Sequence, residues 1–211
     1  MIGYEKEELH LLPNQGHCNV NYLFYKEGKK YHLRKFKLAD RDRKLEFKIQ
    51  NLAAKKRVGA KAYYLDKAIM IGDFVEGEHH KKITRKQTRE LALALRKLHS
   101  IPFLGKPILL KPKIQKRFKM DFVLSHNDLN IKNILFDKHV KFIDWEYAGV
   151  GDRYFDLATV CEAFDLDEAY FLRNYGKKIT HNKLKAYKKI YHDITDEWFL
   201  KLEKGELEFL L

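Results

Sequence analysis

The feature that most limits the fold is a change in hydrophobic pattern close to residue 75. Before it, short runs of alternating apolar residues predict strands, beginning with a hairpin from Val20 to Phe36 that turns at Glu27-Gly28. Two more short strands are expected at Ala62–Leu65 and Ala68–Phe74. The first part of the chain is therefore expected to form a small, β-rich lobe.

Helical periodicity first interrupts and then replaces these strands. A helix is predicted from about Asp40 to Arg57, with Gly59 as its stop. Beyond residue 75, Thr84 and Gln87 have the spacing of a capping box and predict the start of a helix that runs through His99. The other elements expected there are a strand at Phe122–Leu124, a hairpin of Ile134–Phe136 with Val140–Ile143, and helices from Arg153 onward.

The two patterns together predict an α+β fold of two lobes, which a chain of 211 residues is long enough to form. We expect a β-rich lobe in residues 1–75 and a mainly helical lobe in residues 76–211, joined by a short hinge at Asp73–Gly77. A cleft beside such a hinge is a usual place for a ligand.

Composition excludes some classes of protein and leaves others open. Lys and Arg number 42 against 29 Asp and Glu, and the net charge of +13 favours anionic partners such as nucleotides, nucleic acid or an acidic membrane. Cys18 and Cys161 form no C-x-x-C pair, so a cysteine zinc site is not expected and a reducing compartment is. Without a signal-like or membrane-spanning apolar run, the protein is expected to be cytoplasmic, with no membrane span. Its oligomeric state stays open.

Most of the chemical information lies between Ser125 and Glu146. Asp128 follows a predicted strand, Asn133 comes five residues later, and Asp144 ends the next hairpin. Transfer of a phosphoryl group needs one carboxylate to orient the attacking hydroxyl and other oxygen ligands to hold Mg²⁺. Asp and Asn supply the hard oxygen atoms that Mg²⁺ prefers. Any one of these residues could equally be a turn former, so the prediction depends on their order and spacing together.

That order, H-x-D-x-x-x-x-N followed by a hairpin and I-D-x-E, resembles the catalytic and metal-binding loops of the protein kinase-like superfamily. His126-Asn127-Asp128 with Asn133, and Ile143–Tyr147, are most similar to the choline and ethanolamine kinases, including the bacterial choline kinases. The segments Gly151–Ala158 and Cys161-Glu162 extend the similarity. The resemblance implies a two-lobed kinase-like fold that uses ATP and Mg²⁺.

Within the helical lobe, the resemblance assigns Asp128 as the catalytic base or hydroxyl-orienting group. It assigns Asn133 and Asp144 as ligands of Mg²⁺. It implies that His126 supports the geometry of the loop, because an acid–base role is already filled by Asp128.

On the nucleotide side, the resemblance implies that a turn containing Gly16 and Asn19 lies over the phosphates of ATP. It places Arg34 at the position of the phosphate-binding lysine of protein kinases, with Glu46 of the following helix as its partner. The main chain at Phe74 and Val75 would bind adenine. For all of these residues a purely structural role is the alternative.

On the acceptor side, the family binds a cationic alcohol with aromatic rings and carboxylates. The residues that the resemblance points to are Asn130, Glu146, Tyr147, Glu162 and Trp198. The two aromatic residues could equally pack in the core, and an Arg or Lys would serve Glu162 as well as a ligand would. The family usually has two tryptophans close together in the late helix, and only Trp198 is present there.

The expected activity is thus the phosphorylation of a choline-like, small-molecule cationic alcohol. Thiamine, ethanolamine and aminoglycosides are alternative acceptors. An alternative of another class is a kinase-like fold without activity that binds RNA or another polyanion through its lysines. The chain has no aromatic RNA-binding motif, so nucleic acid is the less favoured partner.

Overall fold

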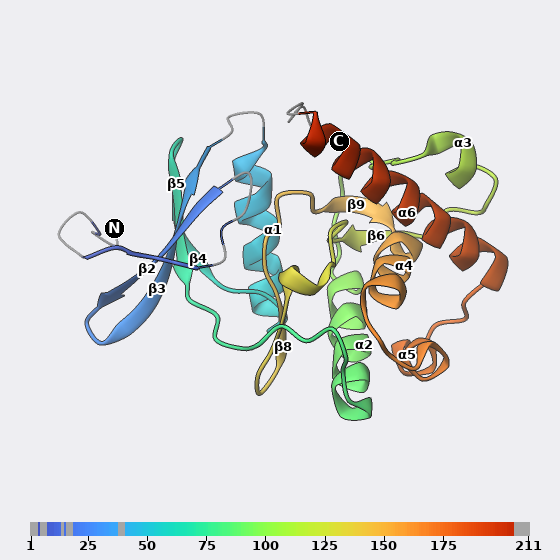
Figure 1. The fold of residues 1–211 in the computed structure, drawn as a ribbon, viewed down its shortest axis with the longest axis horizontal. Helices are drawn as coiled ribbons and strands as arrows, with labels where there is room; N and C mark the ends of the chain where they lie inside the picture. The colour runs from blue at the N-terminus through green and yellow to red at the C-terminus, as the bar shows by residue number, and fades with distance from the viewer. Residues whose placement is uncertain (1–3, 5–7, 14, 16–18, 38–40, 205–211) are drawn as a thin grey trace. The chain divides into compact units, whose positions relative to one another are not determined.

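The computed structural model of the chain describes residues 4, 8–13, 15, 19–37 and 41–204 (Figure 1). Its chain divides into two compact units. The first comprises residues 1–78 together with 135–146, and the second comprises 79–134 with 147–211. The boundary predicted from the sequence lies between residues 75 and 76. The observed division differs from it mainly because residues 135–146 belong to the first unit. The sequence-based domain boundary itself stays a prediction.

A five-stranded antiparallel sheet forms most of the first unit. The predicted hairpin is confirmed: β2 pairs with β3 along its whole length, and Glu27 (φ 50°) and Gly28 (φ 72°) both have the positive φ of a type I′ turn. The strands in spatial order are β1 (His10–Leu11), β2 (Asn19–Lys26), β3 (Lys29–Phe36), β5 (Ile69–Asp73) and β4 (Ala62–Leu65).

The two faces of this sheet have different chemistry, because side chains alternate along each strand. One face contributes the buried core of the unit, which consists of Phe24, Leu33, Ile69 and Ile71 with several tyrosines packed against it. The other face carries polar side chains. There Asn21 lies opposite Arg34, and Asn19 and His32 have the same parity along their strands.

Helix α1 (Arg43–Lys55) lies in the same unit and begins at an Asp42 cap, whose carboxylate accepts the Leu45 N–H. The predicted stop at Gly59 is wrong by a few residues. The chain leaves the helix at Arg57, which has φ 62°, and the Val58 N–H closes the end on the Ala53 carbonyl at 3.0 Å.

A second feature of the first unit is the predicted hairpin that contains β7 (Ile134–Phe136) and β8 (Val140–Phe142), which pair in a two-stranded sheet. The Phe142 N–H donates to the Val58 carbonyl at 2.8 Å. This bond ties the segment that precedes Asp144 to the end of α1.

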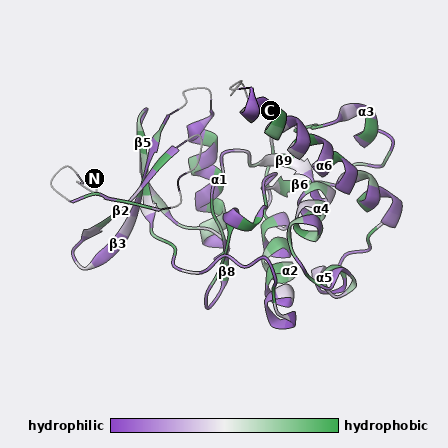
Figure 2. Ribbon diagram, viewed as in Figure 1, coloured by the Kyte–Doolittle hydropathy of each residue, from purple (hydrophilic) through white to green (hydrophobic). Residues whose placement is uncertain are grey.

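The second unit is mainly helical, as predicted. Helix α2 (Arg85–His99) has the complete Thr84–Gln87 capping box. Figure 2 shows it changing from hydrophilic at its first turn to hydrophobic farther along, where Leu91, Leu95 and Leu98 are fully buried. The other helices are α3 (Pro112–Gln115), the 3-10 turn η1 (Ile131–Asn133), α4 (Arg153–Ala163), α5 (Glu168–Tyr175) and α6 (His181–Glu203).

One strand of this unit was not predicted. The expected strand β6 (Phe122–Ser125) pairs antiparallel with β9 (Gly149–Asp152), whose two glycines hide its character in the sequence. Helices α2 and α5 pack together, and so do α4 and α6. Across the described part of the chain, no helix is both long enough and apolar enough to cross a membrane.

Candidate active site

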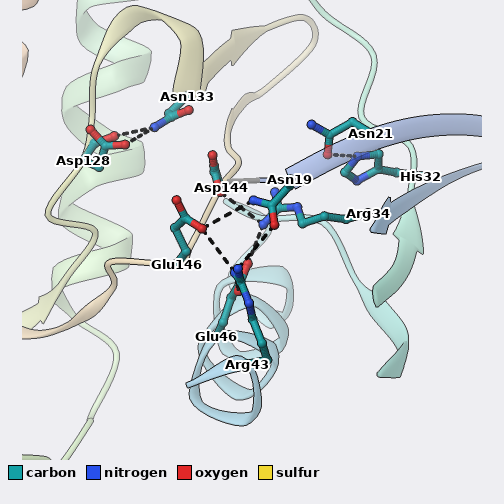
Figure 3. Close-up of polar contacts among 10 residues, drawn as sticks. All are labelled: Asn19, Asn21, His32, Arg34, Arg43, Glu46, Asp128, Asn133, Asp144 and Glu146. Carbon is teal, nitrogen blue, oxygen red and sulfur yellow. Dashed lines mark hydrogen bonds and ion pairs between the residues drawn. The ribbon is translucent and has the colours of Figure 1, made fainter. Parts of the chain in front are cut away.

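The loop that follows β6 fixes the side chain of Asp128. Asn130 caps the turn η1, and its amide donates to Asp128 Oδ1 at 2.9 Å. The Asn133 amide donates to Asp128 Oδ2 at 2.7 Å and to the Asp128 carbonyl at 2.8 Å (Figure 3). These contacts use the nitrogen of Asn133, so its side-chain oxygen, the atom that binds metals, takes no part in them.

Beneath this loop lies a carboxylate to which the sequence analysis gave no role. Asp156 of α4 is completely buried, and its two oxygens accept the backbone N–H groups of His126 and Asn127, each at 2.8 Å. His99 Nε2 is 3.0 Å from Asp156 Oδ2, and His99 Nδ1 is 2.8 Å from the Tyr175 hydroxyl. The loop therefore starts from a fixed main chain, although Asn127 has the left-handed φ of 62°.

Two opposing effects act on the pKa of Asp156. Burial alone would raise it, but the hydrogen bond and charge of His99, with the charge and backbone N–H of His126, outweigh burial and lower the pKa below its usual value. The carboxylate is thus held in its charged form. A signal was present in the sequence, since Asp156 interrupts the apolar run from Tyr154 to Ala158.

In the first unit, the structure brings together two of the predicted nucleotide residues. Arg34 Nη1 lies 2.5 Å from Glu46 Oε1, and both side chains are more than nine-tenths buried. Lys35, the next residue along β3, is exposed. Arg34 Nη1 also lies 3.1 Å from Asp144 Oδ1, so it contacts one of the predicted metal ligands (Figure 3).

Asp144 itself has a conformation that needs support from its surroundings. Its φ is 63°, which is uncommon for a residue other than glycine. The next residue, Trp145, is buried to 1% exposure and packs edge-on against Phe142. Asp144 Oδ1 is buried and lies in an ion pair with Arg34 Nη1, so it occupies a position where positive charge is favoured.

Arg43 is the residue of this unit that sequence reasoning missed. Its Nη1 contacts Glu46 Oε2 at 2.7 Å and Glu146 Oε2 at 3.2 Å, and its Nη2 donates to Asn19 Oδ1 at 3.4 Å. The Asn19 amide in turn donates to Glu146 Oε2 at 3.4 Å. The one available signal was the i, i+3 spacing of Arg43 and Glu46 in the predicted helix.

The remaining residues predicted for the nucleotide side are Gly16, Phe74 and Val75. Gly16 lies outside the described residues. Phe74 and Val75 are partly buried, and the Phe74 N–H donates to the Lys30 carbonyl at 3.4 Å.

The predicted acceptor residues of the second unit make contacts of several kinds. The Glu162 carboxylate pairs with Lys188 at 2.9 Å and with His192 at 2.6 Å. Burial acts to raise the pKa of Glu162, and the bonds to Lys188 and His192 lower it overall. The Tyr147 carbonyl accepts the Asn127 amide at 3.0 Å, and Trp198 of α6 packs edge-on against Phe199.

A β-rich unit, a helical unit and an H-x-D-x-x-x-x-N loop define the class of protein, which has a protein kinase-like fold. The solved choline kinase LicA from Streptococcus pneumoniae has this fold, with a TM-score of 0.79 and 20% identity over 96% of this chain and 87% of that one. Plasmodium vivax ethanolamine kinase is also similar, with a TM-score of 0.76 and 17% identity over 97% of this chain and 78% of that one. The predicted fold class is confirmed.

Sequence comparison adds a family of enzymes and curated relatives to this similarity of fold. Residues 108–188 match the model of the Phosphotransferase enzyme family. Protein LicA of Haemophilus influenzae is 34% identical over 99 residues, which cover 38% of this chain and 36% of that protein. The chain thus matches about a third of the length of this curated relative. The predicted resemblance to choline and ethanolamine kinases within the phosphotransferase family is confirmed.

Proposed function

We propose that this protein is an ATP-dependent kinase that phosphorylates the hydroxyl group of a small cationic alcohol. The observation that carries the proposal is the fixed carboxylate of Asp128, which the Asn130 and Asn133 amides hold at both oxygens. A general base has to be positioned before its basicity matters. The names of the similar proteins, choline kinase and ethanolamine kinase, support the same class of reaction.

In the proposed reaction, the acceptor oxygen attacks the γ-phosphorus of ATP and the bond from that phosphorus to the β–γ bridging oxygen breaks, so ADP leaves. The acceptor's proton passes to Asp128. The Asn130 and Asn133 amides keep this carboxylate from rotating, and Asp156 keeps the loop's main chain in place. Such positioning is a main source of rate enhancement in phosphoryl transfer.

We assign Mg²⁺ ligation to Asn133 and Asp144. The donor set fits this ion, because it consists of a carboxamide oxygen outside the bonds to Asp128 and a carboxylate whose side chain is 30% exposed although Arg34 pairs with its Oδ1, and both are hard oxygen donors. When bound, Mg²⁺ neutralises charge on the nucleotide phosphates. Arg34, which Glu46 orients, would add a second positive charge there. Gly16, Asn19 and the main chain at Phe74 and Val75 complete the proposed nucleotide site.

We assign Asn130, Tyr147, Glu162 and Trp198 to the acceptor side. A cation is favoured by aromatic faces, each contact contributing about 0.5–2 kcal/mol. Glu162 shares Lys188 with Glu168 and also lies against His192, so both of its carboxylate oxygens already have partners. Aromatic contacts would therefore carry more of the recognition than Glu162 does.

The test is ADP release from Mg·ATP with choline, ethanolamine, thiamine and an aminoglycoside as acceptors. We expect Asp128→Asn to lower turnover by about 10²–10⁴-fold, the usual contribution of a general base, and to leave nucleotide affinity unchanged. Asp137→Asn, at an exposed aspartate in the turn after β7, is the matched control and should behave as wild type. Wild-type turnover in the Asp128 variant would remove the assignment. Tight, steeply salt-dependent binding of polyanions without ADP release would favour the non-catalytic alternative.

A further inference from the structure

We propose that Arg43 is a positioning residue for the metal-binding turn, and that Glu146 serves this framework and does not contact the acceptor. The inference rests on the proposed function and adds two roles to it. It concerns side chains that lie within the first unit.

The contacts of Arg43 join four parts of that unit. Its guanidinium contacts Glu46 of its own helix, Glu146 after the metal-binding aspartate, and Asn19 at the start of β2. It also stacks over the ring of Phe36 at the end of β3, 4.3 Å from the centroid. With 10% of its side chain exposed, Arg43 is part of the interior of the unit.

Glu46 makes this arrangement continuous. Its Oε1 binds Arg34 and its Oε2 binds Arg43, while Arg34 reaches Asp144 and Arg43 reaches Glu146. The result is an ion-pair chain of alternating sign, which runs through Asp144, Arg34, Glu46, Arg43 and Glu146 (Figure 3).

The backbone joins the two ends of the ion-pair chain, because they are only two residues apart in the sequence. Its two ends, Asp144 and Glu146, flank the buried Trp145, so both ends of this short turn are held by arginines that share one glutamate. A strained residue such as Asp144, at φ 63°, keeps its conformation only where the surroundings determine it from several sides. We infer that Arg43 supplies one of those sides.

The charges of the ion-pair chain fit this role. Three carboxylates against two guanidinium groups leave one net negative charge, which favours a cation at the Asp144 end. Removing Arg43 takes a cation from both Glu46 and Glu146, whose side chains are buried. A buried carboxylate without its partner destabilises the structure around it. The turn would then relax, and Asp144 would lose its alignment.

Glu146 is correspondingly unsuited to the acceptor. Only 5% of its side chain is exposed, and its Oε2 lies against both Arg43 and the Asn19 amide. A quaternary ammonium group would have to displace the Arg43 guanidinium to reach it. We therefore expect substitution of Glu146 to change metal dependence and to leave the KM for the acceptor unchanged.

The experiment uses three test variants: Arg43→Gln, Glu146→Gln and the variant that carries both changes. The control is Lys44→Gln, which removes an exposed cation from the next position of α1. Two quantities are measured: the Mg²⁺ concentration that half-saturates nucleotide binding, by calorimetry, and the KM for the acceptor. We expect Arg43→Gln and Glu146→Gln each to need about 10–100-fold more Mg²⁺ for half-saturation of nucleotide binding, which is the usual loss for residues that orient metal ligands. The KM for the acceptor should be unchanged in both. Lys44→Gln should match wild type. The double variant should lose less than the product of the two single losses, because the partners are removed together.

The proposal is overturned if Arg43→Gln needs no more Mg²⁺ than wild type. It is also overturned if Glu146→Gln raises the acceptor KM without changing the Mg²⁺ requirement. If Arg43→Gln does not fold, Arg43→Lys and Glu146→Gln give the same comparison. Wild-type protein that binds Mg·nucleotide but phosphorylates no acceptor would refute the proposed function alone, since the binding measurement still reads the role of Arg43. Wild-type protein that binds no Mg·nucleotide would refute both.

Discussion

Replacing Asp156 by asparagine tests how the loop that carries Asp128, the proposed base, is held. Asp156 Oδ2 accepts from His126 N–H and His99, and its Oδ1 accepts from Asn127 N–H. An asparagine has only one accepting oxygen. Even in its best orientation, the new NH₂ group faces the Asn127 N–H, and the two bonds that remain lose the negative charge.

The expected cost follows from these three bonds. A hydrogen bond to a charged group contributes about 1.5–3 kcal/mol, and breaking a buried charged pair by removing one partner costs about 3–5 kcal/mol. Because the bonds share one carboxylate, their costs are not additive, and we expect Asp156→Asn to lower the free energy of unfolding by about 3–5 kcal/mol. In a chain of this size that corresponds to a fall in Tm of about 10 °C.

The assay is urea unfolding of wild type, Asp156→Asn and the control Asp137→Asn, followed by circular dichroism. The pH dependence adds a second reading. The pKa of Asp156 is lower in the folded state, so the stability it contributes is present above its unfolded pKa of about 3.9 and is lost as the pH falls through the folded value. The variant should lack this part of the acid sensitivity. A change in unfolding free energy below about 0.5 kcal/mol would refute the reasoning.

Three further predictions concern stability. Thr84→Ala removes the cap of α2 and should lower the free energy of unfolding by about 1 kcal/mol in urea, whereas Thr84→Ser should keep it. Lys183→Met leaves the buried Asp152 carboxylate without the ammonium that lies 2.6 Å away, and thermal unfolding should show a loss of about 3–5 kcal/mol; a loss equal to that of the exposed Lys185→Met would contradict this. The pKa of His32 is lowered to about 3 by burial and by the charge of Arg34, so the folded state resists protonation, and stability should fall as the pH drops from about 6.5 toward 3. His32→Gln should flatten the stability profile between pH 6.5 and 4, and an unchanged profile would contradict the assignment.

Several features of this protein were predictable from the sequence because they are local. The turn at Glu27-Gly28 and the Thr84 cap depend on residues within a few positions of each other, and both were predicted correctly. The spacing of the H-x-D-x-x-x-x-N loop likewise determined that Asp128 and Asn133 meet, since η1 joins them directly.

Other features depend on residues that are far apart in the chain. Asp156 lies 30 positions from His126, and Arg43 lies 103 positions from Glu146. No periodicity connects such residues, and their polar character alone would also suit a solvated surface. Glu162 shows the same limit: its sequence neighbours indicated a buried carboxylate that needs a cation, but only the packing of α4 against α6 decided that Lys188 is that cation and that His192 lies beside it.

The sequence by itself thus determined the local turns and caps, and it predicted which groups are candidates for phosphotransfer chemistry. The tertiary structure decided how those segments are held, through Asp156 under the loop and the arginines around Asp144. The physical reason is that a buried charge is stable only beside its partner. Which residue becomes that partner depends on how distant parts of the chain pack.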